Sequence, residues 1–243
     1  MRRMLIILKK ELSSLFLSPV AYITTAVFTS ASSWVFLQAV EANEGEDASV
    51  VMLLMVSVMI WLPILITVVS MRLFSEEKRS GTLEALMTVA VSEVSVVLGK
   101  YFSALIFVWL ALVPAVGSIY WFAYISPGID GVDVFALAGG CVILALVSMS
   151  CVAIGLLVSL LTRNQIVAAI SCFAAICVPF LIKSVVVVVP FVTDSVVQYL
   201  SLENHLLSFA AGTLSLPVFV LYLSESVLLL FAAVRVLEAR RWL

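Results

Sequence analysis

Few residues of this chain could carry chemistry, and the most conspicuous is a single carboxylate, Glu225, inside a long apolar run. An ionisable side chain at such a position is costly, so it marks a functional site by default. It would either line a translocation path or, when protonated, share a hydrogen bond with Ser224, Ser226 or a neighbouring helix. Because no other His, Asp or Glu lies inside an apolar stretch, the sequence gives no support to acid–base catalysis.

The remaining metal-binding and nucleophilic residue types are scattered. The four cysteines, Cys141, Cys151, Cys172 and Cys177, all lie in apolar runs, and none forms a C-x-x-C pair or neighbours a histidine. A free cysteine in such a run acts as a small hydrophobic residue. His205 is the only histidine. We therefore predict no metal site, a packing role for the cysteines, and a surface or packing role for His205.

The sequence also lacks a phosphate-binding loop. Such a loop requires G-x-x-x-x-G-K-[ST]. At the one Gly-Lys pair, Gly99-Lys100, Val94 takes the place of the first glycine and Tyr101 that of the Ser or Thr. We predict that the chain neither binds nor hydrolyses ATP, has no catalytic residue and needs no cofactor.

Composition decides the class of protein. The chain has 243 residues, 64% hydrophobic and only 12% charged, with a mean hydropathy of +1.24. Soluble domains are roughly 45–50% apolar and about 25% charged, and disordered chains are more polar still. A globule of this size could not bury so much apolar surface. The chain is predicted to be an integral membrane protein.

The apolar stretches predict an all-α protein with six transmembrane helices in one domain spanning residues 1–243, because about 20 residues cross a bilayer as a helix. The stretches lie near residues 20–40, 50–71, 101–125, 134–161, 166–189 and 214–234. All but one of the 13 Lys and Arg residues, Lys183 being the exception, fall on one side of this topology. The positive-inside rule then places both termini in the cytoplasm.

The first residues form a separate amphipathic pattern. Met4, Leu8, Leu12 and Leu15 recur at helical spacing, and Pro19 ends the pattern. The pattern predicts a helix in the membrane interface, with its basic residues toward the lipid headgroups. The alternative is that these residues are only the cytoplasmic end of the first span.

The one sizeable cytoplasmic connection, residues 72–100, contains two helix-start signals. Ser75 precedes two acidic residues and is predicted as a helix N-cap. Leu83, Leu86 and Met87 mark the apolar face of a short helix, and Ser92 is predicted to cap a helix that continues into the third span. A short, exposed amphipathic element of this kind suits docking to a soluble partner.

The same connection carries a family resemblance. Residues 76–84 read EEKRSGTLE, and this run, together with Val91-Ser92 and the Leu-Gly-Lys at 98–100, resembles the cytoplasmic loop of ABC-2 class permeases of ABC transporters. It is most similar to the gliding-motility-associated permease family, although Ala90 stands where that family usually has proline. Residues 161–169, 204–214 and 237–242 resemble the family as well.

The resemblance implies a permease subunit, with an exporter expected, in the bacterial cytoplasmic (inner) membrane. It implies two permease subunits per transporter, as a homodimer or heterodimer, and a separate cytoplasmic ABC ATPase; no nucleic acid is expected as a partner. The residues that the resemblance implies in coupling to the ATPase are Glu76, Glu77, Arg79, Gly81, Thr82, Leu83 and Glu84.

Two kinds of alternative remain open. One is an ABC permease with a narrower task, such as copper-site maturation or drug efflux. The other is a protein that needs no ATPase: an ion-coupled carrier or a membrane-embedded enzyme. A carrier usually shows inverted repeats, and none is detected. An enzyme should show His, Asp or Glu clustered at one membrane depth, where the sequence offers only Glu225.

Overall fold

The computed structural model describes residues 2–43, 49–81, 92–125, 133–186, 199–213 and 215–241, and within these ranges it contains helices and no strand. The helices are α1 (Arg2–Leu17), α2 (Pro19–Ala42), α3 (Val50–Leu73), α4 (Ser75–Arg79), α6 (Glu93–Ile125), α7 (Val134–Leu161), α8 (Gln165–Val186), α10 (Leu202–Ala210) and α11 (Leu216–Arg241). The amphipathic helix predicted around Leu83–Ala90, with Thr82, Leu83 and Glu84, lies outside the described residues.

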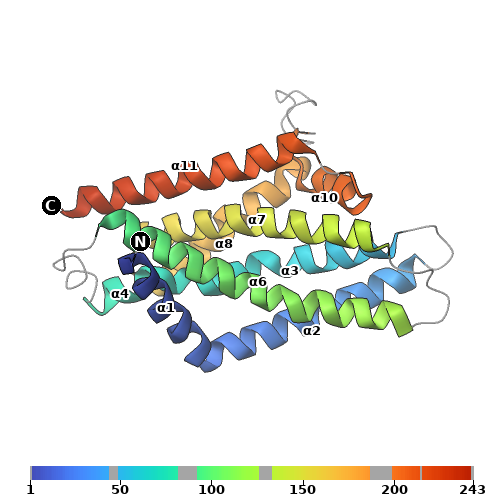
Figure 1. Cartoon of the computed structure of the whole chain (residues 1–243), viewed down its shortest axis with the longest axis horizontal. Helices are drawn as coiled ribbons and strands as arrows, with labels where there is room; N and C mark the ends of the chain where they lie inside the picture. Colours follow the sequence, from blue (N-terminus) through green and yellow to red (C-terminus); the bar gives the residue numbers. More distant parts are fainter. Residues whose placement is uncertain are drawn as a thin grey trace.

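The long helices form an elongated bundle with the two chain ends near the same end (Figure 1). That end also holds α4 and the first turns of α6, and we call it the α4 end. The short helix α10 lies at the opposite end. The described chain thus has two distinct ends, each with its own short helix.

Within the described residues, five helical segments are long and apolar enough to cross a membrane. They are Pro19–Ala42, Val50–Arg79, Glu93–Trp121, Val134–Leu161 and Leu216–Ala239. The remaining stretch that we predicted as a span corresponds to α8, of which Gln165–Leu181 counts as a shorter apolar helix. For the part of the chain that the structure describes, the all-helical membrane architecture is confirmed, with five candidate spans.

Helices α3 and α7 form the centre of the bundle. About three fifths of the span window of each is buried, against about a fifth for α2 and α11. Close packing depends on glycine: a Cβ at Gly155 would collide with Ser70, and one at Gly140 with Met55. Small residues let membrane helices approach in this way.

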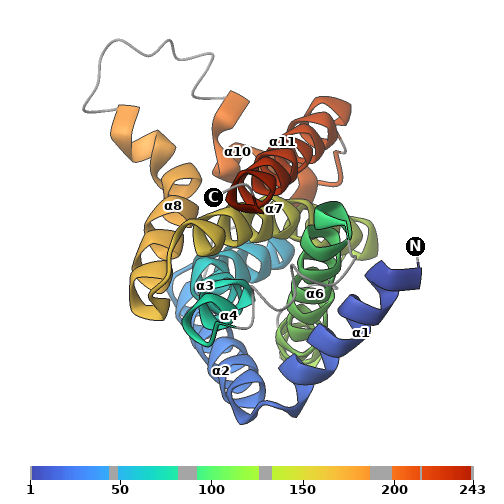
Figure 2. The ribbon, with the colours of Figure 1, turned by 90° about the vertical axis from the view of Figure 1, so that its left-hand side faces the viewer.

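A helix forms over the amphipathic N-terminal residues, and it ends before the first span begins. Ser18 has an extended backbone and separates α1 from α2, whose first residue is Pro19. Seen from the α4 end, α1 lies across the side of α6 (Figure 2). Phe16 of α1 packs edge-on against Phe107 of α6, with ring centroids 5.6 Å apart.

The two predicted helix starts in the connection have different outcomes. Helix α6 begins at Glu93, directly after Ser92, and continues to Ile125 without a break. The N-cap prediction for Ser75 is wrong, because Ser75 is the first residue of α4 and its hydroxyl donates to the carbonyl of Met71. Helix α4 follows α3 with only Phe74 between them, so the Ser75 side chain bonds back to α3.

Candidate coupling site

Helix α4 is a single short turn held at one end of the bundle by α7. The hydroxyl oxygen of Ser159 accepts from the backbone N–H groups of Phe74 and Ser75, at 3.2 and 3.3 Å. These are free donors at the start of a helix, so Ser159 of α7 supplies the cap that sequence reasoning assigned to Ser75. Capping of α4 therefore comes from another helix.

Lys78 fastens the other side of α4. Its ammonium donates to the carbonyl of Leu160 and, at 3.2 Å, to that of Thr162. These carbonyls lie at the C-terminus of α7, where backbone acceptors are unpaired and the helix dipole favours a cation. The end of α7 thus holds α4 by two sets of hydrogen bonds, one accepted by the Ser159 side chain and one accepted by backbone carbonyls from Lys78.

A buried ion cluster joins α4 to two further helices. The side chain of Lys100, on α6, is 1% exposed, and its Nζ lies 2.8 Å from Oε1 of Glu77 and 3.1 Å from Oε1 of Glu11. The Nζ also lies 5.2 Å from the ring centroid of Phe74. A lysine is almost never so buried unless it is paired, and here the pairs connect α1, α4 and α6. We call Lys100, Glu11 and Glu77 the Lys100 cluster.

The outward side of α4 carries most of the other residues implied in coupling. Glu76, Arg79 and Gly81 are exposed. Gly81 has φ +71°, a left-handed conformation that glycine adopts without strain, and it ends the described part of this connection. Glu77 alone among the described coupling residues turns inward, to Lys100.

Sequence reasoning missed Lys100, Glu11, Ser159 and Lys78. The sequence did contain a signal for Lys100. Val96, Val97 and Ala104 lie three or four residues from it, so Lys100 falls on the apolar side of a helix rather than in a loop. Glu11 likewise falls on the apolar side of α1. The partners of Ser159 and Lys78 carry no local signal, since they are about 80 residues away in the chain.

Glu225 lies apart from this cluster, about a third of the way along α11. It is partly buried, and it lies one turn after the buried Tyr222. The two serines proposed as partners bond elsewhere, since Ser224 donates to the carbonyl of Leu221 and Ser226 to that of Tyr222. Neither serine therefore donates a hydrogen bond to Glu225.

His205 packs in the described core at the end opposite α4. Its side chain is 5% exposed and its Nδ1 lies 3.0 Å from the hydroxyl oxygen of Tyr222. Burial lowers the pKa of His205 below its ordinary value of 6.5, although a backbone hydrogen bond at Tyr199 acts in the opposite direction. His205 thus has the packing role predicted from its surroundings in the sequence.

A bundle of long apolar helices with a buried ion cluster at one end defines a multi-pass α-helical membrane protein. The family model described as ABC-2 family transporter protein matches residues 8–178. The chain belongs to the ABC-2 family and is a membrane permease of ABC-transporter type. No curated protein matched the chain in sequence comparison.

Proposed function

We propose that the chain is the transmembrane subunit of an ATP-driven exporter, and that α4 receives the push from a separate cytoplasmic ABC ATPase. The observation that carries the proposal is the arrangement of α4. Its outward side presents Glu76 and Arg79, whereas its inward side is bonded to the bundle through Lys78 and Glu77. A segment that is exposed on one side and ionically fixed on the other is suited to transmit force.

The route of the force follows from the bonds. Displacement of α4 moves the end of α7 through Lys78 and moves α1 and α6 through Lys100. Since α7 is central in the bundle, a tilt of this helix changes the packing of α3 and α11 as well. This change would expose a transport path to one membrane face and then to the other. Thr82, Leu83 and Glu84 would contribute to the contact with the ATPase.

The α4 end is proposed to face the cytoplasm of a bacterium. The membrane is proposed to be the cytoplasmic (inner) membrane. The basic residues near this end, among them Arg72, Lys78 and Arg235, support this under the positive-inside rule. Helix α8 would be the sixth span, because its 22 residues extend about 33 Å, enough for the hydrocarbon core of a bilayer. Six spans place both termini on the same side, in agreement with Figure 1.

Two further parts of the proposal rest on the sequence resemblance. The permease would pair with a second permease subunit, identical or different, and it would belong to the gliding-motility-associated branch of the family. Export as the direction of transport has the same support. The substrate is left open, including the narrower tasks of copper-site maturation and drug efflux.

The proposal is tested by purification of the tagged permease from its own host in mild detergent, with mass spectrometry and an ATPase assay on the eluate. We expect an ABC ATPase to co-purify. The double variant Glu76→Lys with Arg79→Glu should lose the ATPase while the permease keeps its elution profile. Arg235→Glu is the matched control, because Arg235 is exposed near the same end of the bundle.

The opposite result has a definite meaning. An intact permease that never carries an ATPase, in several detergents, would contradict the proposal and favour an ion-coupled carrier. Attention would then move to Glu225, since a partly buried carboxylate inside a span is the group such a carrier would use.

A further inference from the structure

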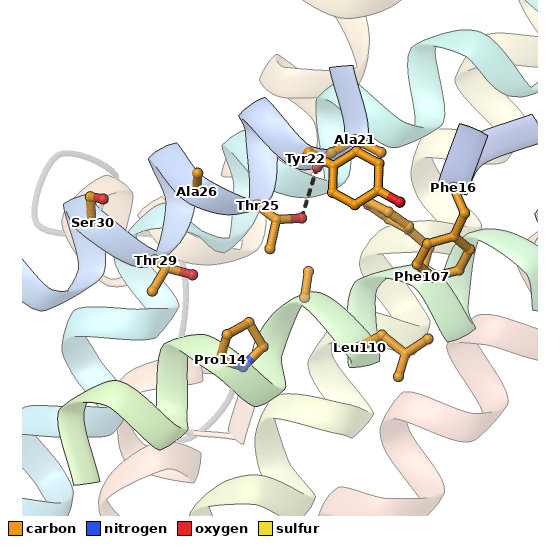
Figure 3. Close-up of a pocket in the computed structure, with 11 residues that line it drawn as sticks. Phe16, Ala21, Tyr22, Thr25, Ala26, Thr29, Ser30, Phe107, Leu110 and Pro114 are labelled. Atoms are coloured by element: carbon orange, nitrogen blue, oxygen red, sulfur yellow. Dashed lines mark hydrogen bonds between the residues drawn. The ribbon is translucent and has the colours of Figure 1, made fainter. Parts of the chain in front are cut away.

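A groove runs between α2 and α6, beginning where α1 ends (Figure 3). Its volume is about 440 Å³. Helix α2 contributes hydroxyl-bearing side chains such as Thr25 and Thr29, whereas α6 contributes an apolar wall that includes Phe107 and Pro114. Tyr22 on its rim is largely exposed, so the groove opens on the outer surface of the bundle, where a bilayer would lie.

The groove adjoins an arginine that lacks a carboxylate. Arg72, in the last turn of α3, is partly buried, and its Nη1 makes a long bond of 3.4 Å to the hydroxyl oxygen of Ser18. Its Nε is buried without a hydrogen-bond partner. Among the described residues no Asp or Glu forms an ion pair with it. A small cavity beside Arg72 and Ser18 shares Ala21 and Phe107 with the groove.

The buried Nε without an acceptor favours an anion at Arg72. A guanidinium has five donors and no acceptor, and an unpaired charge away from water is costly. Phosphate oxygens match the planar donors of arginine especially well. Ser18 adds a hydroxyl at the point where α1 turns into α2.

The two features together fit one amphiphile. An anionic group at Arg72 and an apolar chain in the groove would meet at Ala21 and Phe107, which both cavities share. Lys9 and Lys10 on the exposed side of α1 add positive charge near this end. Basic pockets between membrane helices at the headgroup level bind anionic lipid headgroups. We propose that Arg72 binds the phosphate of an anionic phospholipid whose acyl chain lies in the α2–α6 groove.

This inference does not depend on the ATPase or on the Lys100 cluster, and its test uses binding alone. The full-length permease is delipidated in detergent and titrated with dioleoyl phosphatidylglycerol, and bound lipid is counted by native mass spectrometry. Phosphatidylcholine with the same chains, whose headgroup has no net charge, serves as the comparison lipid. Inorganic phosphate is the competitor that separates a lipid site from a bare anion site.

Arg72→Gln should weaken phosphatidylglycerol binding about tenfold or more, because a hydrogen-bonded charge is lost. Ala26→Trp should also weaken it, because Ala26 lines the groove and the indole would occupy the place of the chain. Arg235→Gln is the matched control: this arginine is 65% exposed near the same end of the bundle and pairs with Glu238. Its binding should equal that of the unaltered protein.

Three results would overturn the proposal. The first is unchanged lipid binding in Arg72→Gln. The second is an equal loss in Arg235→Gln, which would show attraction by surface charge only. The third is complete displacement by inorganic phosphate together with no effect of Ala26→Trp. If Arg72→Gln fails to fold, two single variants decide the matter. Arg72→Lys keeps the charge and should keep most of the affinity for phosphatidylglycerol, whereas Ala26→Trp should lose most of it.

Discussion

The Nζ of Lys100 lies 2.8 Å from Oε1 of Glu77 in a place where the lysine side chain is 1% exposed. This pair joins a long helix of the bundle to the short helix α4 that follows α3. Glu11, at 3.1 Å from the same nitrogen, adds the N-terminal helix. One cation thus holds three helices that are separated in the chain, and loss of that cation has predictable consequences.

Lys100→Met should destabilise the permease by about 3–5 kcal/mol, because two partly buried carboxylates would face each other without their cation. Thermal unfolding in detergent, with the remaining folded protein measured by size-exclusion chromatography, determines this loss of stability. The triple variant with Met at positions 11, 77 and 100 should regain most of the stability, because an apolar replacement of a buried ion cluster is often neutral. Equal instability of the single and triple variants would contradict the pairing.

Ser159→Ala should cost about 1 kcal/mol, since two backbone N–H groups of α4 lose their acceptor. The change should also be local. Hydrogen–deuterium exchange should accelerate in the peptide that contains Phe74 and Ser75, while peptides from α11 stay protected. A uniform acceleration over the whole chain would argue against a specific capping role.

His205 should make stability depend on pH at the end opposite α4. Burial favours the neutral ring and lowers the pKa of His205 below 6.5 in the folded chain. As pH falls, the unfolded chain takes up the proton first, so the stabilisation is complete above about pH 6.5 and decreases toward the lowered pKa. His205→Gln should reduce the change in melting temperature between pH 5 and 7. An unchanged slope would assign the pH dependence to other groups.

Glu225→Gln tests whether the carboxylate lines a path. If it does, removal of the charge should impair complementation of a deletion strain at a normal protein level, because ionisable groups inside spans usually serve function. Ser224→Ala is a suitable control, since this exposed hydroxyl bonds only to its own helix. Full complementation by Glu225→Gln would leave the residue a packing role.

Helix α8 should behave as a membrane span. In a cysteine-free background, single cysteines at Ser80, Thr213 and Ala239, all exposed, can be labelled with a membrane-impermeant thiol reagent. We expect residues 80 and 239 to react from one side and residue 213 from the other. Labelling of 80 and 213 from the same side would mean that α8 does not cross.

The sequence by itself determined the membrane class, the helical architecture and the positions of the main apolar helices. These follow from local properties: apolar residues in runs of about 20 must be helical in lipid, because each backbone group has to be bonded within its own segment. The start of α6 at Glu93 was predictable for a similar reason, since the signal at Ser92 lies beside it in the chain. Pro19 likewise predicted the break between the first two helices at Ser18.

Tertiary structure alone decided which charges in the connection face inward. Glu76 and Glu77 are neighbours in one acidic run, yet Glu76 is exposed and Glu77 pairs with Lys100. Their difference depends on where α6 and α1 pack, and pairing between residues 23 and 89 positions apart leaves no local pattern. The same holds for Ser159, whose hydroxyl caps a helix about 85 residues earlier only because α3 and α7 meet at Gly155.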